Sequence, residues 1–255
     1  MSIPLAVFLG VLGLALASIG IYTLLGRGRD EDAARKGSQF LLGLGDFLVH
    51  WFMWVIGPAE RLALRFHATP DVFNFAGLGF GLLSGLLIAR GELPLGGWAI
   101  ALGGVCDILD GRIARATRTD SAYGKFIDST LDRFVEVFAF LGFAVYLRGF
   151  PHGPVVVTAA LAGSLLVSYA RARGESLGVL CREGLMQRAE RLVLTSLSCL
   201  ADPALCGFRG WPKGTLVYWV LVLIAAGTLT TAAHRTAWIA RRLRRQAPHG
   251  GSNRA

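Results

Sequence analysis

Charge is scarce in this sequence. Only 17% of its 255 residues are Asp, Glu, Lys or Arg, whereas 53% are apolar, and the mean hydropathy is +0.52. A chain so poor in charge lacks the profile of a soluble domain of this size. The composition therefore argues against an ordinary soluble enzyme and indicates a polytopic membrane protein.

The residues that usually build transition-metal sites are also few and dispersed. The five histidines are scattered, and the four cysteines, Cys106, Cys181, Cys199 and Cys206, have no zinc-type spacing. Cys199 and Cys206 bracket the sequence LADPAL at the end of an apolar segment, so a disulfide is one interpretation, with buried free thiols as the default. The sequence shows no internal repeat.

Long apolar segments dominate what remains. Compared with the ~20 residues needed to cross a bilayer, the candidate spans lie near 3–25, 73–90, 95–114, 126–147, 154–172, 189–206 and 215–238. The first segment lacks a basic start and is followed by Arg27, Arg29, Arg35 and Lys36. This pattern predicts an uncleaved anchor rather than a signal peptide.

The distribution of positive charge predicts the orientation. Nearly all Lys and Arg residues fall in 26–72, 115–125, 173–188 and the C-terminal tail, whereas the opposite side has Arg90, Arg148, Arg209 and Lys213. The positive-inside rule then places the N-terminus outside and the basic loops in the cytoplasm, as expected for a bacterial inner membrane. The net charge of +9 lacks interleaved aromatics, so we expect membrane lipids and phosphorylated substrates as partners and no nucleic acid.

Four carboxylates stand beside these apolar segments. Asp107 and Asp110 are three residues apart, and Asp128 and Asp132 are four apart, so each pair shares one face of a helix. The polar sequence ATRTDSAY between them is short enough to make the two helices antiparallel. Because an unpaired Asp at mid-bilayer costs about 2.5 kcal/mol or more, we expect the four to converge near the cytoplasmic boundary around a counter-charge.

Divalent cations would supply that charge. Ligands that are all carboxylates favour Mg²⁺, Mn²⁺ or Ca²⁺ over zinc, and two ions about 3.5–4 Å apart could serve phosphoryl transfer. Gly111, Ala114 and Gly124 leave room for a phosphate-bearing ligand, although small residues also permit tight helix packing. Arg115 is either a phosphate ligand or an interfacial arginine.

Residues 107 to 132 run Asp-x-x-Asp-Gly-x-x-Ala-Arg, eight residues, Gly-x-x-x-Asp-x-x-x-Asp. This resembles the signature of the CDP-alcohol phosphatidyltransferase family, whose members transfer a substituted phosphate from a CDP-linked lipid to a hydroxyl and release CMP. The family's six-helix transmembrane core implies an all-α protein with a core over 69–240. Outside it would lie a transmembrane anchor and basic linker (1–36), an interfacial amphipathic helix (37–68) and a basic cytoplasmic tail (241–255).

The resemblance also implies roles for individual residues. Asp107, Asp110, Asp128 and Asp132 would hold two Mg²⁺ ions, or Mn²⁺, and Asp132 would also act as general base. Asp71 and Asn74, from TPDVFN, would contact the nucleotide, with Asn74 in place of the usual Thr. The other residues implied to bind CDP-diacylglycerol are Gly111, Ala114, Arg115, Ser121 and Gly124. The family also implies a homodimer.

A second basic stretch bears on the acceptor. Arg171 and Arg173, in SYARARGESLG, and Arg188 and Arg191, in GLMQRAERLVL, would form an anion pocket, although charge alone also fits positive-inside flanks. These segments resemble the phosphatidylinositol-phosphate synthase branch, which implies inositol phosphate as acceptor. Glycerol 3-phosphate, as in phosphatidylglycerol-phosphate synthases, is the alternative. A divalent-cation transporter is the alternative from another class. Glu136, one turn past Asp132, would either extend the acidic site or be a paired or protonated core residue.

Overall fold

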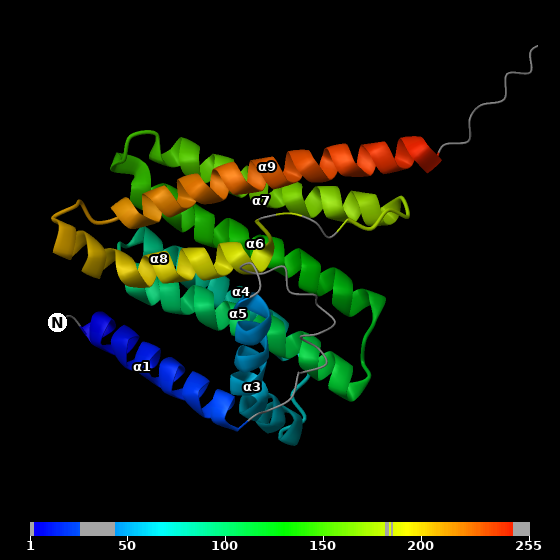
Figure 1. Ribbon diagram of the computed structural model, residues 1–255, viewed down its shortest axis with the longest axis horizontal. Coiled ribbons are helices and arrows are strands. Elements are labelled where there is room, and N and C mark those ends of the chain that lie inside the picture. Colours follow the sequence, from blue (N-terminus) through cyan, green and yellow to red (C-terminus); the bar gives the residue numbers. More distant parts are fainter. Residues whose placement is uncertain (1–2, 26–43, 182–183, 185, 247–255) are drawn as a thin grey trace, which may run out of the picture.

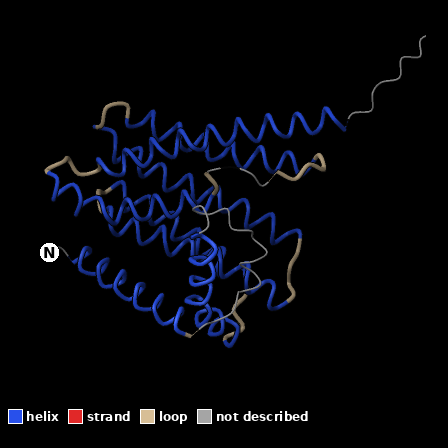
Figure 2. Tube along the Cα trace, in the orientation of Figure 1, coloured by secondary structure: helices blue, strands red, loops and turns tan. Residues whose placement is uncertain are grey.

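The computed structural model describes residues 3–25, 44–181, 184 and 186–246, and within these residues it contains helices and no strand (Figure 2). The helices are α1 (Ile3–Leu24), α3 (Leu44–Arg65), α4 (Pro70–Ala89), α5 (Leu93–Thr117), α6 (Ala122–Tyr146), the short 3-10 helix η2 (Leu147–Gly149), α7 (Gly153–Ser176), α8 (Arg188–Arg209) and α9 (Thr215–Gln246). Figure 1 shows α4 to α9 as a bundle, with α1 along one side.

Each apolar segment predicted from the sequence is a helix in the structure. Among the described residues, α4, α5, α7, α8 and α9 are long and apolar enough to cross a membrane. The helix α6 is as long as α5, but its first half carries charged residues of the candidate site. The predicted all-α membrane class is confirmed, whereas residues 26–43 and 247–255, part of the predicted linker, interfacial segment and tail, lie outside the described residues.

The helix α4 is the element that positions α5 and α6. It packs along both of them, and α7 packs on α9 while α5 packs on α8. The contact of α4 with α6 is backbone to backbone, because a Cβ atom built on Gly142 would collide with Gly85, and one on Gly85 with the carbonyl of Phe138. Small residues are the usual means of bringing membrane helices this close.

The helix α3 crosses the direction of the bundle helices in Figure 1, which suits the predicted interfacial helix. It packs on α5 through Ile56 and Ala63, which contact the cluster around Leu109 and Ile113. An ion pair also joins these two helices: Arg112 Nε lies 2.6 Å from Glu60 Oε2. The helix that carries Asp107 and Asp110 is therefore tied to α3 by apolar contacts and by charge.

Contacts from α3 reach α1 as well. The indole of Trp51 donates a hydrogen bond of 3.0 Å to Ser18 Oγ, and the ring of Tyr22 lies 5.7 Å from the rings of Phe47 and Trp54. Beyond these contacts most described side chains of α1 are exposed, as expected for a helix that faces lipid.

The cysteines settle one open interpretation. All four are buried and free. Cys199 and Cys206 both lie on α8, separated by two helical turns, or about 10 Å of helical rise. Disulfides need Cα atoms within about 7 Å, so the alternative of a Cys199–Cys206 bridge was wrong and the default of free thiols holds.

Asp202 is a buried carboxylate far from the candidate site, and it caps α9. It has no exposed surface, and it accepts hydrogen bonds from the backbone N–H groups of Gly214 (2.7 Å), Leu216 (3.0 Å) and Val217 (3.3 Å). These are donors that the first turn of a helix otherwise leaves unsatisfied.

Replacing Asp202 by Ala is expected to lower the free energy of unfolding by about 2–4 kcal/mol, because a cap is lost and buried N–H groups are left unpaired. Thermal unfolding in detergent, followed by circular dichroism, measures the change. Asp120→Ala, an exposed residue in the α5–α6 connection, is the control and should change little. Equal melting temperatures for Asp202→Ala and the wild type would contradict the capping role.

Candidate active site

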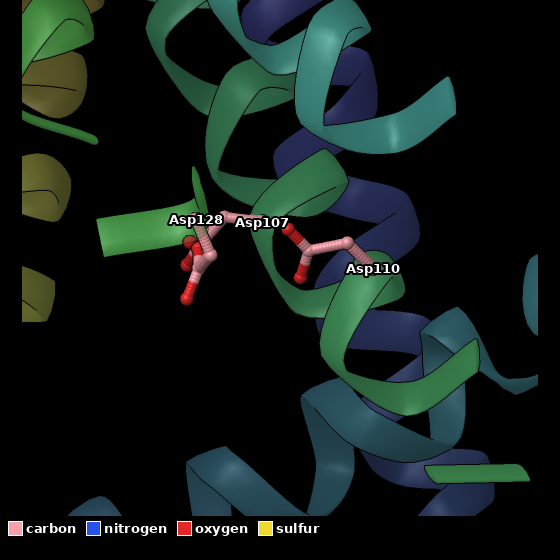
Figure 3. Close-up of side chains that lie close together, drawn as sticks. All are labelled: Asp107, Asp110 and Asp128. Carbon is pink, nitrogen blue, oxygen red and sulfur yellow. The ribbon is translucent and has the colours of Figure 1, made fainter. Parts of the chain in front are cut away.

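Three carboxylates from two helices meet at one place. Asp107 and Asp110 lie in the last three turns of α5, and Asp128 lies in the second turn of α6. One carboxylate oxygen from each lies within 4.8 Å of the others, and Figure 3 shows the three side chains gathered between the two helices. Asp110 is 5% exposed, whereas Asp107 and Asp128 are half-buried.

The short connection between the helices produces this meeting. Arg118 ends α5 in a left-handed conformation, with φ of 55°, and the chain then reverses. Ser121 starts α6 as its N-cap, because its Oγ accepts a hydrogen bond of 3.0 Å from Gly124 N. A Cβ atom on Gly124 would lie 3.3 Å from that Oγ, so the motif glycine leaves room for the cap.

Asp132 is joined to the group through an arginine. Arg188, the first residue of α8, forms an ion pair of 2.7 Å with Asp107 Oδ1 and a second ion pair with Asp132 Oδ1. Asp132 also has Arg133 Nη1 at 3.5 Å from its Oδ2. The structure therefore brings Asp107, Asp110 and Asp128 together, and it links Asp132 to Asp107 by way of the Arg188 guanidinium.

One helical turn further along α6 and α8, a second ion pair joins these two helices. Arg191, which is 3% exposed, donates from Nε to Glu136 Oε1 at 3.0 Å and also pairs with that oxygen through Nη2. Its Nη1 lies 3.4 Å from the carbonyl oxygen of Met186. Of the two sequence interpretations of Glu136, the structure supports the paired core residue.

The remaining predicted acceptor residues lie at the end of α7. Arg171 and Arg173 are exposed, and Arg171 Nε is 2.9 Å from Glu175 Oε1. Sequence analysis missed Arg235 on α9, which is 3% exposed and donates to the carbonyl of Val167 at 3.1 Å. The charges of Arg171 and Arg191 act on Arg235, so these three arginines share one electrostatic environment. A lone Arg inside the apolar stretch AAHRTAWIA was the available signal.

The residues predicted to contact the nucleotide differ in their surroundings. The guanidinium of Arg115 lies over Gly111, since a Cβ atom there would be 3.3 Å from Arg115 Nη1. Ala114 is half-buried, Asn74 is buried, and Asp71 is exposed in the first turn of α4. Ser121 uses its oxygen as a cap acceptor but keeps a hydroxyl hydrogen to donate.

The donor set of the three-carboxylate group fits a hard divalent cation. Its candidate ligand atoms are carboxylate oxygens, which Mg²⁺, Mn²⁺ and Ca²⁺ prefer. Three negative charges this close also repel one another, and the guanidinium of Arg188 neutralises only part of them. A divalent cation would relieve that repulsion.

Comparison with known proteins identifies this combination of helical bundle and carboxylate group. The model of the CDP-alcohol phosphatidyltransferase family matches residues 67–202, and the chain belongs to that family. It is 36% identical over 191 residues to the phosphatidylinositol phosphate synthase of Cutibacterium acnes, covering 72% of this chain and 91% of that one. It is also 36% identical over 143 residues to the archaetidylinositol phosphate synthase of Methanothermobacter thermautotrophicus, covering 56% and 70%.

Solved structures support the fold. The crystal structure of Mycobacterium tuberculosis phosphatidylinositol phosphate synthase with CDP-DAG bound superposes with a TM-score of 0.62 at 24% identity, over 78% of this chain and 96% of that one. A structure of the same protein in complex with manganese and citrate gives 0.63 at 24% identity, over 78% and 92%. The family resemblance drawn from the sequence is thus confirmed, and the protein is a membrane enzyme that transfers a substituted phosphate group.

Proposed function

We propose that this protein transfers the phosphatidyl group of CDP-diacylglycerol to a hydroxyl of inositol phosphate and releases CMP. The single observation that carries the proposal is the convergence of Asp107, Asp110 and Asp128, with Asp132 one ion pair away and basic side chains beside them. The relatives at 36% identity are synthases of inositol phosphate lipids, which supports the choice of acceptor.

We assign to Asp132 the role of taking the proton of the acceptor hydroxyl. It lies on α6 one turn past Asp128 and faces α8 through its contact with Arg188. As the acceptor oxygen attacks the β-phosphorus, the bond to CMP breaks and the proton passes to an Asp132 oxygen. Arg115, which lies over Gly111, is positioned to contact the diphosphate of the CDP moiety, with Asp71, Asn74, Ala114, Ser121 and Gly124 lining the remainder of that site.

We assign two divalent ions, Mg²⁺ or Mn²⁺, to Asp107, Asp110, Asp128 and Asp132. When bound, such ions supply electrophilic stabilisation of the charge that develops on the phosphate oxygens. The manganese complex of the tuberculosis enzyme supports the choice of metal. Arg188 pairs with one oxygen of Asp107 and one of Asp132, so it would compete with the cations for these two oxygens.

The acceptor phosphate would then meet a cluster of arginines. Arg188, Arg191, Arg171 and Arg173 are the residues expected from the sequence, and Arg235 joins them because the charges of Arg171 and Arg191 act on it. Guanidinium groups bind phosphate through paired N–H donors. A phosphorylated acceptor accounts for so many arginines at one end of the bundle, whereas an uncharged alcohol would not.

The placement in the cell is part of the proposal. The active site would face the cytoplasm of a bacterial inner membrane with the N-terminus outside, and protease access to an N-terminal tag in sealed vesicles tests this. The divisions 1–36, 37–68, 69–240 and 241–255 are retained as the working organisation. A homodimer is proposed by analogy with the family, and crosslinking in membranes tests it.

The decisive experiment supplies CDP-diacylglycerol and one acceptor at a time to purified protein and measures CMP release. Inositol phosphate is expected to give turnover, and glycerol 3-phosphate at least tenfold less. Turnover with glycerol 3-phosphate alone would overturn the acceptor assignment. Metal flux into vesicles without any CDP-lipid would instead favour the transporter alternative.

A further inference from the structure

Only one of the two carboxylate oxygens of Glu136 has a hydrogen-bond partner among the described residues. Oε1 accepts from both Nε and Nη2 of Arg191. Oε2 is buried, and in the described protein it has no hydrogen-bond partner. The side chain as a whole is 12% exposed, and that of Arg191 is 4% exposed, so this oxygen is withdrawn from solvent together with the pair.

A buried acceptor without a donor is unfavourable, and such atoms are uncommon in folded proteins. A buried ion pair is also no strong source of stability, since apolar residues of similar volume often serve as well. The ion pair with Arg191 therefore accounts for Oε1 of Glu136 but not for its Oε2. A carboxylate oxygen in this state is suited to receive a donor from a ligand.

The position of Glu136 indicates which ligand. It follows Asp132 by one turn on the same face of α6, which places it about 6 Å further along the helix axis. Its partner Arg191 likewise follows Arg188 by about one turn on α8. The two ion pairs form successive levels between α6 and α8, the outer at the proposed base and the inner at Glu136. For a second hydroxyl of the acceptor to reach Glu136, the ring must extend from Asp132 toward this inner level.

We propose that Glu136 is a specificity residue for the acceptor: its Oε2 accepts a hydrogen bond from a hydroxyl of the polyol ring other than the one that attacks. This inference rests on the proposed function and deepens it. Glycerol 3-phosphate offers a single hydroxyl besides the attacking one, whereas inositol phosphate offers several on a rigid ring. A site built to bind such a hydroxyl strongly disfavours analogues that lack it.

The test combines Glu136→Gln with a series of deoxyinositol phosphates, each lacking one ring hydroxyl. In Glu136→Gln an oxygen can still face Arg191, while an amide donor replaces the acceptor Oε2. With the wild type, one member of the series should show a KM about tenfold or more above that of inositol phosphate. With Glu136→Gln, the KM for inositol phosphate should rise about 10- to 100-fold, and that analogue should lose its disadvantage.

A merely structural role would raise KM for all analogues alike and preserve their ratios, and that result would overturn the inference. So would a wild-type series in which no single deoxygenation matters, a result that needs no variant. Glu92→Gln, at the exposed start of α5, is the matched control. Wild-type protein inactive with inositol phosphate but active with glycerol 3-phosphate would instead show that the proposed function had failed.

Discussion

Asp132→Asn is expected to lower kcat for CMP release by about 10²- to 10⁴-fold, the range that general-base catalysis contributes. The amide keeps the shape of the carboxylate but cannot take a proton from the acceptor hydroxyl. The KM for CDP-diacylglycerol should change little, because the residues assigned to the nucleotide lie on α4, on α5 and at the start of α6. Steady-state CMP release in detergent micelles measures both constants.

Asp132→Asn also weakens the contact with Arg188, so the fold must be checked alongside. Gel filtration and circular dichroism should show a monodisperse, helical protein with a melting temperature near that of the wild type. Asp120→Asn, in the exposed connection before α6, controls for the loss of one negative charge near the site. A kcat within threefold of the wild type would remove Asp132 from the role of base.

Removal of divalent cations is expected to abolish CMP release, and Mg²⁺ or Mn²⁺ should restore it. Asp110→Asn should raise the dissociation constant for Mn²⁺ at least tenfold. Asp110 is the most buried of the three grouped carboxylates, so a water molecule cannot easily take the place of its oxygen as a metal ligand. Electron paramagnetic resonance of free and bound Mn²⁺ measures this without any turnover.

Arg188 provides a second, opposite test of the same site. Its guanidinium contacts Asp107 and Asp132, so it competes with cations for these oxygens. Arg188→Gln should therefore lower the dissociation constant for Mn²⁺ while raising the KM for the acceptor.

The prediction for Asp110 has its own contradicting outcome. If Asp110→Asn binds Mn²⁺ as tightly as the wild type does, the three carboxylates are not the metal site.

The parts of this architecture that depend on local pattern were predictable from the sequence. Apolar runs of membrane length became helices, and the spacing of Asp107, Asp110 and Asp128 with a short polar connection brought their side chains together. Both inferences depend only on helical periodicity and chain reversal. Neither requires knowledge of how distant helices pack.

The unpredicted parts are contacts between helices distant in sequence. The sequence predicted that Arg188 would lie in a basic pocket beside the carboxylates, but not its ion pairs with Asp107 and Asp132, nor the pair of Arg112 with Glu60. Such partners depend on the rotation and depth of each helix in the bundle, which no periodicity encodes. Arg235 was overlooked for a related reason, since its neighbours are supplied by α7 and α8 rather than by its own helix.

The backbone contact of α4 with α6 at Gly85 and Gly142 leaves no room for a larger side chain at either position. One set of site residues, the three grouped carboxylates, lies on α5 and α6, and α4 packs against both of these helices. The second set, the arginines, lies at the ends of α7 and α8 and on α9. Under the proposed function, substitutions in this second set would retune which alcohol is used, except at Arg188, which also contacts Asp107 and Asp132 and so belongs to the reaction centre as well. Laboratory evolution aimed at new headgroups would best confine its libraries to that second set.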